Sequence, residues 1–181
     1  MKINTVNKLY HGTDKEFDTF DFSKAKKFKD FGKGYYLTTD FRQAQKWAQK
    51  RGDRSKKAYI YCYDVDKVSD NSLRILELLQ YDSEWLEFIS KCRMEGFDDK
   101  KYDIIYDRIA DTQYLEIADT LQDYREHIIS AEEAIAKIRW KDLRADQYCF
   151  KSEKALKLLK NRNVIIQYKD ISGKWLQEKD G

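Results

Sequence analysis

Two short motifs near the start of this chain combine residue types that could hold a flat, amide-bearing ligand. His11 and Gly12 form the first motif, and a glycine lets a backbone N–H and C=O approach a planar carboxamide closely. The His11 side chain can then donate a hydrogen bond to a hydroxyl group. Gly32 and Gly34 form the second motif and permit a tight turn with positive backbone dihedral angles. A nicotinamide ring carrying a carboxamide and a ribose is the kind of ligand that these groups suit.

Two aromatic residues stand where they could enclose such a ring. Tyr36 lies in a predicted strand, and Trp47 lies eleven residues later inside the predicted helix that follows. Placed on opposite sides of a slot, each could stack on a flat ring, which is worth about 0.5–1.5 kcal/mol beyond area burial. A positively charged ring adds a cation–π attraction of similar size. Taken singly, each of these residues suits a turn or a core; their ordered combination favours a ligand site.

The elements that must position these residues follow from hydrophobic periodicity and capping signals. A strand over 6–10 ends at His11, and a short strand covers 35–38. Thr39 or Asp40 then caps a helix that runs to about residue 50, with Gly52 as its C-terminal stop. Further strands are predicted over 58–65, 102–106, 147–150 and 164–168, and further helices over 73–92, 111–124, 130–140 and 152–159, the third of these helices opening with a capping box at Ser130.

This order of elements predicts an α+β fold. Strands and helices interleave without the regular spacing of βαβ units, which argues against a doubly wound sheet. At 181 residues the chain suits one domain over 1–181. Within it, residues 73–140 are expected to form a mostly helical insertion, and residues 170–181 a peripheral or frayed tail.

Composition narrows the classes of protein further. The chain is 41% hydrophobic, which argues against disorder, and 35 basic residues against 32 acidic ones leave a net charge of +3, so it is not a polycation. The lysine-rich segment 24–33 is either a solvated loop or a mouth that attracts pyrophosphate or a nucleic-acid backbone. No apolar run reaches the length of a membrane span, so we expect a cytoplasmic protein without a membrane partner.

Cysteine and histidine content argues against metal chemistry. The three cysteines, Cys62, Cys92 and Cys149, have no paired spacing, and Cys62 and Cys149 are expected to be buried thiols. Only two histidines, His11 and His127, are present, so a zinc site is not expected.

The two motifs resemble those of the ADP-ribosyltransferase superfamily, on the branch shared by poly-ADP-ribose polymerases and diphtheria toxin. The polymerase signature reads His-Gly-Ser/Thr, then Phe-Gly-Lys-Gly-Ile-Tyr-Phe-Ala, then a helix with a second tyrosine eleven residues after the first. Trp47 stands where that family has the tyrosine that stacks on nicotinamide, and Ala44 replaces a serine that helps to hold the carboxamide. The direct matches are His11-Gly12-Thr13, Phe31-Gly32-Lys33-Gly34 and Tyr36.

A third superfamily position carries a glutamate on a late strand, where it hydrogen-bonds the nicotinamide ribose. The corresponding tract here, Asp146-Gln147-Tyr148, places Gln147 at that position. Glutamine can still accept a hydroxyl proton, but it lacks the charge that stabilises the transition state, often the largest catalytic contribution. Asp146 faces the opposite side of the strand and cannot substitute. Asp111 is either an auxiliary acid or the N-cap of a helix.

The resemblance implies an ADP-ribosyltransferase-like split antiparallel β-sheet core and NAD as a substrate, without a metal. Over residues 8–160 the chain also resembles a family of small bacterial proteins associated with toxin–antitoxin or phage-defence loci. We therefore expect a mono-ADP-ribosyltransferase acting on a protein or nucleic acid, with a cognate antitoxin as a candidate partner. A catalytically weak or dead NAD or ADP-ribose-binding module, and an NAD glycohydrolase, are the alternatives. The implied catalytic residues are His11, Tyr36 and Gln147, and the implied NAD-binding residues are His11, Gly12, Thr13, Gly34, Tyr36 and Trp47.

Overall fold

The computed structural model describes residues 2–69, 72–108, 114–139 and 146–178, which form two four-stranded sheets and five α-helices. The first sheet has the strand order β1-β3-β7-β8, and the second has the order β2-β6-β5-β4. All neighbouring strands are antiparallel except β4 and β5, which are parallel. This architecture confirms the α+β prediction. The strands are β1 (Lys8–Thr13), β2 (Tyr35–Leu37), β3 (Lys57–Val65), β4 (Ile75–Leu78), β5 (Ile104–Arg108), β6 (Asp146–Phe150), β7 (Leu159–Lys169) and β8 (Trp175–Gln177).

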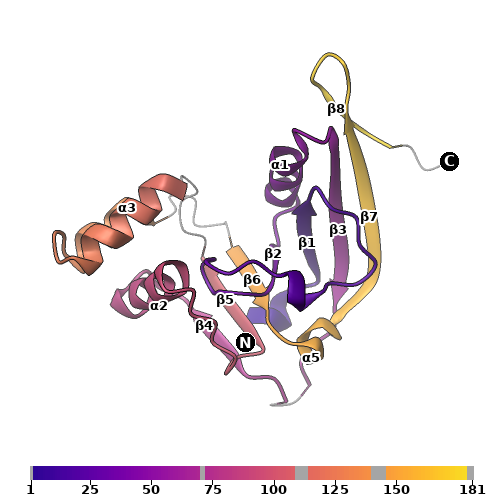
Figure 1. The fold of residues 1–181 in the computed structure, drawn as a ribbon. Coiled ribbons are helices and arrows are strands. Elements are labelled where there is room, and N and C mark those ends of the chain that lie inside the picture. Colours follow the sequence, from indigo (N-terminus) through magenta and orange to yellow (C-terminus); the bar gives the residue numbers. More distant parts are fainter. Residues whose placement is uncertain (1, 70–71, 109–113, 140–145, 179–181) are drawn as a thin grey trace.

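The helices cover different sheets. Figure 1 shows α1 beside β1 and β3 of the first sheet, with α2 and α3 on the outer side of the second sheet. Asp40 caps α1 by accepting a hydrogen bond from the Arg42 backbone N–H at 2.8 Å, as the sequence predicts. The capping box at Ser130 is likewise confirmed. The helices are α1 (Phe41–Gly52), α2 (Ser83–Met94), α3 (Tyr114–Arg125), α4 (Ala131–Ile138) and α5 (Glu153–Leu156), and short 3-10 turns cover Lys2–Thr5 and Phe22–Lys24.

Within the described residues, one β-bridge joins the two sheets. Tyr10 of β1 and Thr38, just after β2, exchange two backbone hydrogen bonds of 2.9 Å each. Before and after this bridge the strands belong to separate sheets, so the sheets diverge on either side of it. The split therefore falls between the two motifs that the sequence singles out.

The interior consists of two main cores that lie on opposite faces of the second sheet. Side chains alternate along β6, so Tyr148 and Phe150 pack between the two sheets while Cys149 packs against the helices. The core between the sheets is rich in tyrosine, and the core beside the helices includes the fully buried Trp85 of α2. A smaller cluster lies under α1, where Ala44 and Ala48 meet Ile60 of β3.

The segment 73–140 differs from the expected helical insertion. Residues 75–78 form β4 instead of the start of a helix, because this short apolar run pairs with β5, and α2 begins only after its N-cap Asp82. The segment thus supplies two strands of the second sheet as well as helices. A short segment in which three of four residues are apolar suits a buried strand or a helix equally well, and the partner strand decides between them.

Four further expectations need correction or lie outside the described residues. Gly52 does not stop α1 but belongs to it, where a Cβ would lie only 2.1 Å from the Lys57 carbonyl oxygen. Residues 170–178 are peripheral, as expected, but not frayed, since β8 pairs with β7 in a hairpin that extends past the other strands (Figure 1). Asp111 lies outside the described residues. Of the three free cysteines, Cys92 and Cys149 are buried, while Cys62 is half-buried, so the expectation for Cys62 was wrong.

Candidate functional site

His11 points into the aromatic core between the two sheets. Its ring lies 4.6 Å from that of Tyr35, between ring centroids, and its Nδ1 atom lies 2.7 Å from the Tyr36 carbonyl oxygen. Burial lowers the pKa of His11 to about 4, so the imidazole is neutral at pH 7. A carbonyl can only accept, so the proton is assigned to Nδ1 and Nε2 keeps its lone pair. In this tautomer Nε2 can only accept a hydrogen bond, whereas the sequence analysis expected the side chain to donate one.

Gly12 is the point of closest approach between β1 and α1. A Cβ at this position would lie 1.9 Å from the Ala44 carbonyl oxygen and 2.8 Å from the Ala48 backbone nitrogen. Any side chain here would push the helix off the sheet. The glycine thus has a structural purpose in addition to the predicted one, and it holds α1 directly beside the split between the sheets.

The backbone of Gly12 faces the split between the sheets. Backbone N–H and C=O groups alternate between the two edges of a strand, and those of Tyr10 point to Thr38. Gly12 lies two residues after Tyr10 in β1, so its N–H and C=O groups point to the same side as those of Tyr10, where β2 has diverged from β1. Among the residues that the structure describes, no hydrogen bond outside the β1–β3 pairing involves the Gly12 backbone. One donor and one acceptor are therefore aimed into the split.

Tyr36 is held by the turn that precedes its own strand. Its hydroxyl donates to the Gly32 carbonyl oxygen at 2.7 Å and accepts from the Phe31 backbone N–H at 3.1 Å. Its ring is stacked on that of Phe31, with centroids 6.1 Å apart and planes at 14°. Burial raises the pKa of Tyr36 well above its ordinary value, so the hydroxyl stays protonated.

The glycines of this turn have different roles. Gly32 has a φ of 70°, as predicted, which favours glycine. Gly34 does not have a positive φ, which corrects the expectation for that residue; a Cβ there would instead meet the Cys149 sulfur at 2.2 Å. Thr13, the third residue of the first motif, is buried, and its hydroxyl accepts from the Lys15 backbone N–H at 3.2 Å.

Trp47 lies on α1, apart from the other predicted residues. Its indole is half-buried, and the Lys50 ammonium lies 5.4 Å from the ring centroid. The aromatic ring pairs of the described residues do not join Trp47 to Tyr36 or to His11. The structure thus brings His11 and Tyr36 together through a backbone contact, whereas Ala44 and Ala48, and not Trp47, are the α1 residues that pack on Gly12.

Gln147 meets a residue that the sequence analysis missed. Its side-chain nitrogen donates to Asp30 Oδ2 at 2.9 Å, and Arg93 of α2 donates to Asp30 Oδ1 at 2.5 Å. Asp107 is the cross-strand partner of Gln147 and accepts from the Trp85 indole N–H at 2.6 Å. Two buried carboxylates therefore flank Gln147. The position of Asp30 directly before the Phe31-Gly32 motif was a signal that could have been used, but its partners could not be inferred.

Positive charge surrounds this group. Burial lowers the pKa of Lys29, and the nearby Arg51 of α1 lowers it further, followed at smaller size by Arg93. The same Arg51 contributes to the lowered pKa of His11. Like charges repel, so each lowered pKa reports cations gathered near one another. Lys29, from the lysine-rich segment 24–33, therefore lies near Arg51 and Arg93.

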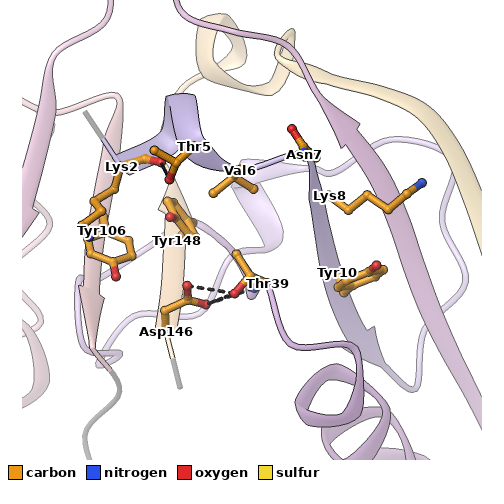
Figure 2. Close-up of a pocket in the computed structure, with 10 residues that line it drawn as sticks. All are labelled: Lys2, Thr5, Val6, Asn7, Lys8, Tyr10, Thr39, Tyr106, Asp146 and Tyr148. Atoms are coloured by element: carbon orange, nitrogen blue, oxygen red, sulfur yellow. Dashed lines mark hydrogen bonds between the residues drawn. The ribbon is translucent and has the colours of Figure 1, made fainter. Parts of the chain in front are cut away.

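Asp146 lies on the opposite side of β6 from Gln147, which confirms the predicted alternation. Both of its carboxylate oxygens accept from the Thr39 hydroxyl at 2.9 Å (Figure 2), and burial raises its pKa. Together with Tyr10 and Tyr148 it lines a cavity of about 520 Å³. This cavity does not include Gly12, Tyr36 or Trp47, so it is separate from the group around Gln147.

Fold and site define an α+β protein whose two sheets part beside a glycine backbone, a half-buried imidazole and a paired glutamine. Residues 7–161 match the model of the family described as "Protein of unknown function (DUF3990)". The match covers most of the chain, which therefore belongs to this family. No curated protein and no solved structure matches the chain. Among the described residues, no helix is both long and apolar enough to cross a membrane, and no cluster of three or more His, Cys, Asp or Glu could hold a metal ion.

Proposed function

We propose that this protein is an NAD-dependent mono-ADP-ribosyltransferase that modifies an intracellular macromolecule, as a bacterial toxin or anti-phage effector. The observation that carries the proposal is the Gly12 backbone, whose N–H and C=O face the split between the sheets beside Tyr36. A primary carboxamide has one acceptor and one donor group at matching spacing, so nicotinamide is the ligand that this pair suits best.

Cations and aromatic rings around the split support the same ligand. Tyr36 and Trp47 would flank the nicotinamide ring, and Lys29 and Arg51 would attract the pyrophosphate. His11 would accept from a ribose hydroxyl through Nε2, because its Nδ1 proton already binds the Tyr36 carbonyl oxygen. Each group thereby has one part of NAD to contact.

Catalysis would centre on Gln147. Its amide oxygen can accept from a ribose hydroxyl while its nitrogen stays bound to Asp30. The bond between C1″ and the nicotinamide nitrogen breaks, and the electron pair leaves with nicotinamide. The acceptor nucleophile then bonds to C1″ and loses its proton. The Asp30 carboxylate, one hydrogen bond away from Gln147, supplies negative charge that the glutamine lacks, although Arg93 offsets part of it.

The binding step is tested by calorimetry with NAD. We expect Trp47→Ala to weaken NAD binding about tenfold, because it removes one wall for the ring. Trp175→Ala is the matched control: that indole is also half-buried, but it lies at β8 in the β7–β8 hairpin. Equal affinity in the wild type and both variants, or no uptake of NAD at all, would refute the proposed site.

The transfer step is tested with labelled NAD and bacterial lysate. If the transferred label survives nuclease treatment but is released by protease, the acceptor is a protein. If it survives protease but is released by nuclease, the acceptor is a nucleic acid. Nicotinamide release without any added macromolecule would identify an NAD glycohydrolase instead. Absence of both label transfer and free nicotinamide would rule out the transferase.

The neutral side chain of Gln147 favours a second candidate function. A module that binds NAD or ADP-ribose without turnover needs the hydrogen bonds of the site but no charge at this position. Arg93, which neutralises Asp30, suits such a module as well. If the protein binds NAD and Trp47→Ala weakens that binding, but the lysate assay detects no turnover, the protein is a binding module and not a transferase.

A further inference from the structure

A second cavity, of about 650 Å³, lies at the end of β6 remote from Gln147, next to the turn that holds Tyr36. We call it the basic cavity. Two of its residues, Lys151 and Ser152, directly follow β6, and Lys33 belongs to the turn. Five cationic side chains line it: Lys27, Lys33, Arg74, Lys100 and Lys151.

Only part of this charge is neutralised. Lys151 binds Asp98 at 2.7 Å, and Arg74 binds Asp103 at 3.4 Å. Within the described ranges, no ion pair includes the other three cations, Lys27, Lys33 and Lys100. The basic cavity therefore keeps an excess of positive charge that an anionic partner can meet.

Aromatic side chains stand at the rim of the basic cavity. Phe28 and Phe97 are 48% and 42% exposed, which is unusual for such large apolar groups. Both lie at Gly96, a lining residue: Phe97 follows it in the chain, and a Cβ on Gly96 would lie 2.8 Å from the Phe28 ring. Phe28 has a φ of 57°, a conformation that bulky residues rarely adopt. Two rings are thus exposed beside the unpaired lysines.

We propose that the basic cavity and its aromatic rim bind single-stranded nucleic acid. Lysines would contact phosphates, and Phe28 and Phe97 would stack on bases, which is how proteins hold single strands without sequence preference. The bases of a duplex are already stacked, and the Asp and Glu side chains that make a peptide acidic have no rings for these residues to engage. The exposed aromatics therefore favour a single strand over either alternative.

The basic cavity adjoins the candidate NAD site through one turn. Lys151 donates to the Phe31 and Lys33 carbonyl oxygens at 2.6 and 2.8 Å, while the same turn carries Asp30, which binds Gln147. A strand bound in the cavity would lie near C1″ of a bound NAD and could serve as the acceptor. That role depends on the proposed function, whereas the binding itself does not.

The experiment measures fluorescence anisotropy of a labelled 12-nucleotide oligo(dU) or oligo(U), without NAD. We expect Lys27→Glu/Lys100→Glu to weaken binding at least tenfold and to reduce the slope of log affinity against log salt by about 1.4, or 0.7 for each lost phosphate contact. Phe28→Ala/Phe97→Ala should weaken binding about thirtyfold or more, at about 1 kcal/mol or more for each lost stack, without changing that slope, because stacking releases no counterions.

The matched control is Lys137→Glu/Lys174→Glu, which reverses two exposed lysines elsewhere on the surface. It should change affinity by less than about twofold. Equal losses in the two lysine double variants, tighter binding of a duplex or an acidic peptide than of the single strand, or no effect of the phenylalanine changes would each overturn the proposal. Since NAD is absent, failure of the transferase leaves this test unaffected, and its own failure leaves NAD binding untouched.

Discussion

Replacing Gln147 by glutamate would set a second carboxylate against that of Asp30. In the wild type, the Gln147 amide nitrogen donates to Asp30 Oδ2 at 2.9 Å, and both side chains are largely shielded from water. A hydrogen bond to a charged group contributes about 1.5–3 kcal/mol, and its loss is the first cost of the change. Two unit charges about 4 Å apart repel by about 4 kcal/mol at an effective dielectric constant of about 20, an effect that Arg93 partly offsets. We expect the Gln147→Glu variant to lose about 3 kcal/mol of unfolding free energy at pH 8.

The deficit should depend on pH. Repulsion raises the pKa of the new glutamate in the folded state above its unfolded value of about 4.3. The folded variant therefore binds more protons than the unfolded one, so its deficit relative to the wild type grows as pH rises from 4.3 to the raised pKa. Near pH 5 the new glutamate is protonated in the folded state and its O–H can donate to Asp30, which replaces the lost hydrogen bond, so the deficit should fall below about 1 kcal/mol.

Urea unfolding followed by tryptophan fluorescence at pH 5 and pH 8 measures this difference. The control is Gln147→Glu/Asp30→Asn, which exchanges the amide and the carboxylate; it should remove the repulsion and with it the pH dependence of the deficit, while the loss of the Asp30–Arg93 ion pair keeps the variant less stable than the wild type. A single variant as stable as the wild type at pH 8 would refute the contact between Gln147 and Asp30. The double variant also gives the fairer test of the missing catalytic charge: under the proposed function, it should release nicotinamide faster than the wild type.

Three further predictions concern the elements around the site. Gly12→Ala should cost about 2 kcal/mol or more of unfolding free energy, because the new Cβ would lie 1.9 Å from the Ala44 carbonyl oxygen; a loss below about 0.5 kcal/mol in urea unfolding would contradict that packing. Burial lowers the pKa of His11 from 6.5 to about 4, so the folded protein is most stable above pH 6.5, where the ring is neutral in both states. As pH falls from 7 to 5, the free energy of unfolding should drop by about 2 kcal/mol because the unfolded state takes up the proton first. His11→Gln should remove this part of the pH dependence, and an unchanged profile of unfolding free energy against pH would count against it. Ser130→Ala should cost about 1 kcal/mol by removing the N-cap of α4, and an unchanged thermal midpoint would show that the capping box does not stabilise the fold.

Local signals in the sequence predicted much of the framework. The aromatic and β-branched run of β3, the Asp40 cap of α1 and the Ser130 capping box each depend on residues a few positions apart, so their physics is readable along the chain. The positive φ of Gly32 was predictable in the same way, because the backbone conformation of a turn residue depends on its immediate neighbours in the chain. The α+β class followed from the order of these elements.

Local patterns failed where the partner was remote. Residues 75–78 became β4 only because β5 lies beside them, and Gly34 and Gly52 are glycines because another segment packs against them, at Cys149 and Lys57 respectively. The sequence shows a small residue at such positions without showing whether a turn or a close neighbour requires it.

The sequence by itself determined the two motifs, the strands and helices that carry them, and the presence of Gln147 where the resemblance places a glutamate. Only the tertiary structure decided what that glutamine touches. The contacts of Asp30 with Gln147 and with Arg93 join residues 117 and 63 positions apart. The direction of the Gly12 backbone likewise depends on one bridge between Tyr10 and Thr38. Hydrogen bonds and ion pairs between residues remote in sequence form only when the sheets and helices have packed. A buried polar group without a partner is costly, so these contacts are needed, but the order of residues along the chain does not show which groups will meet.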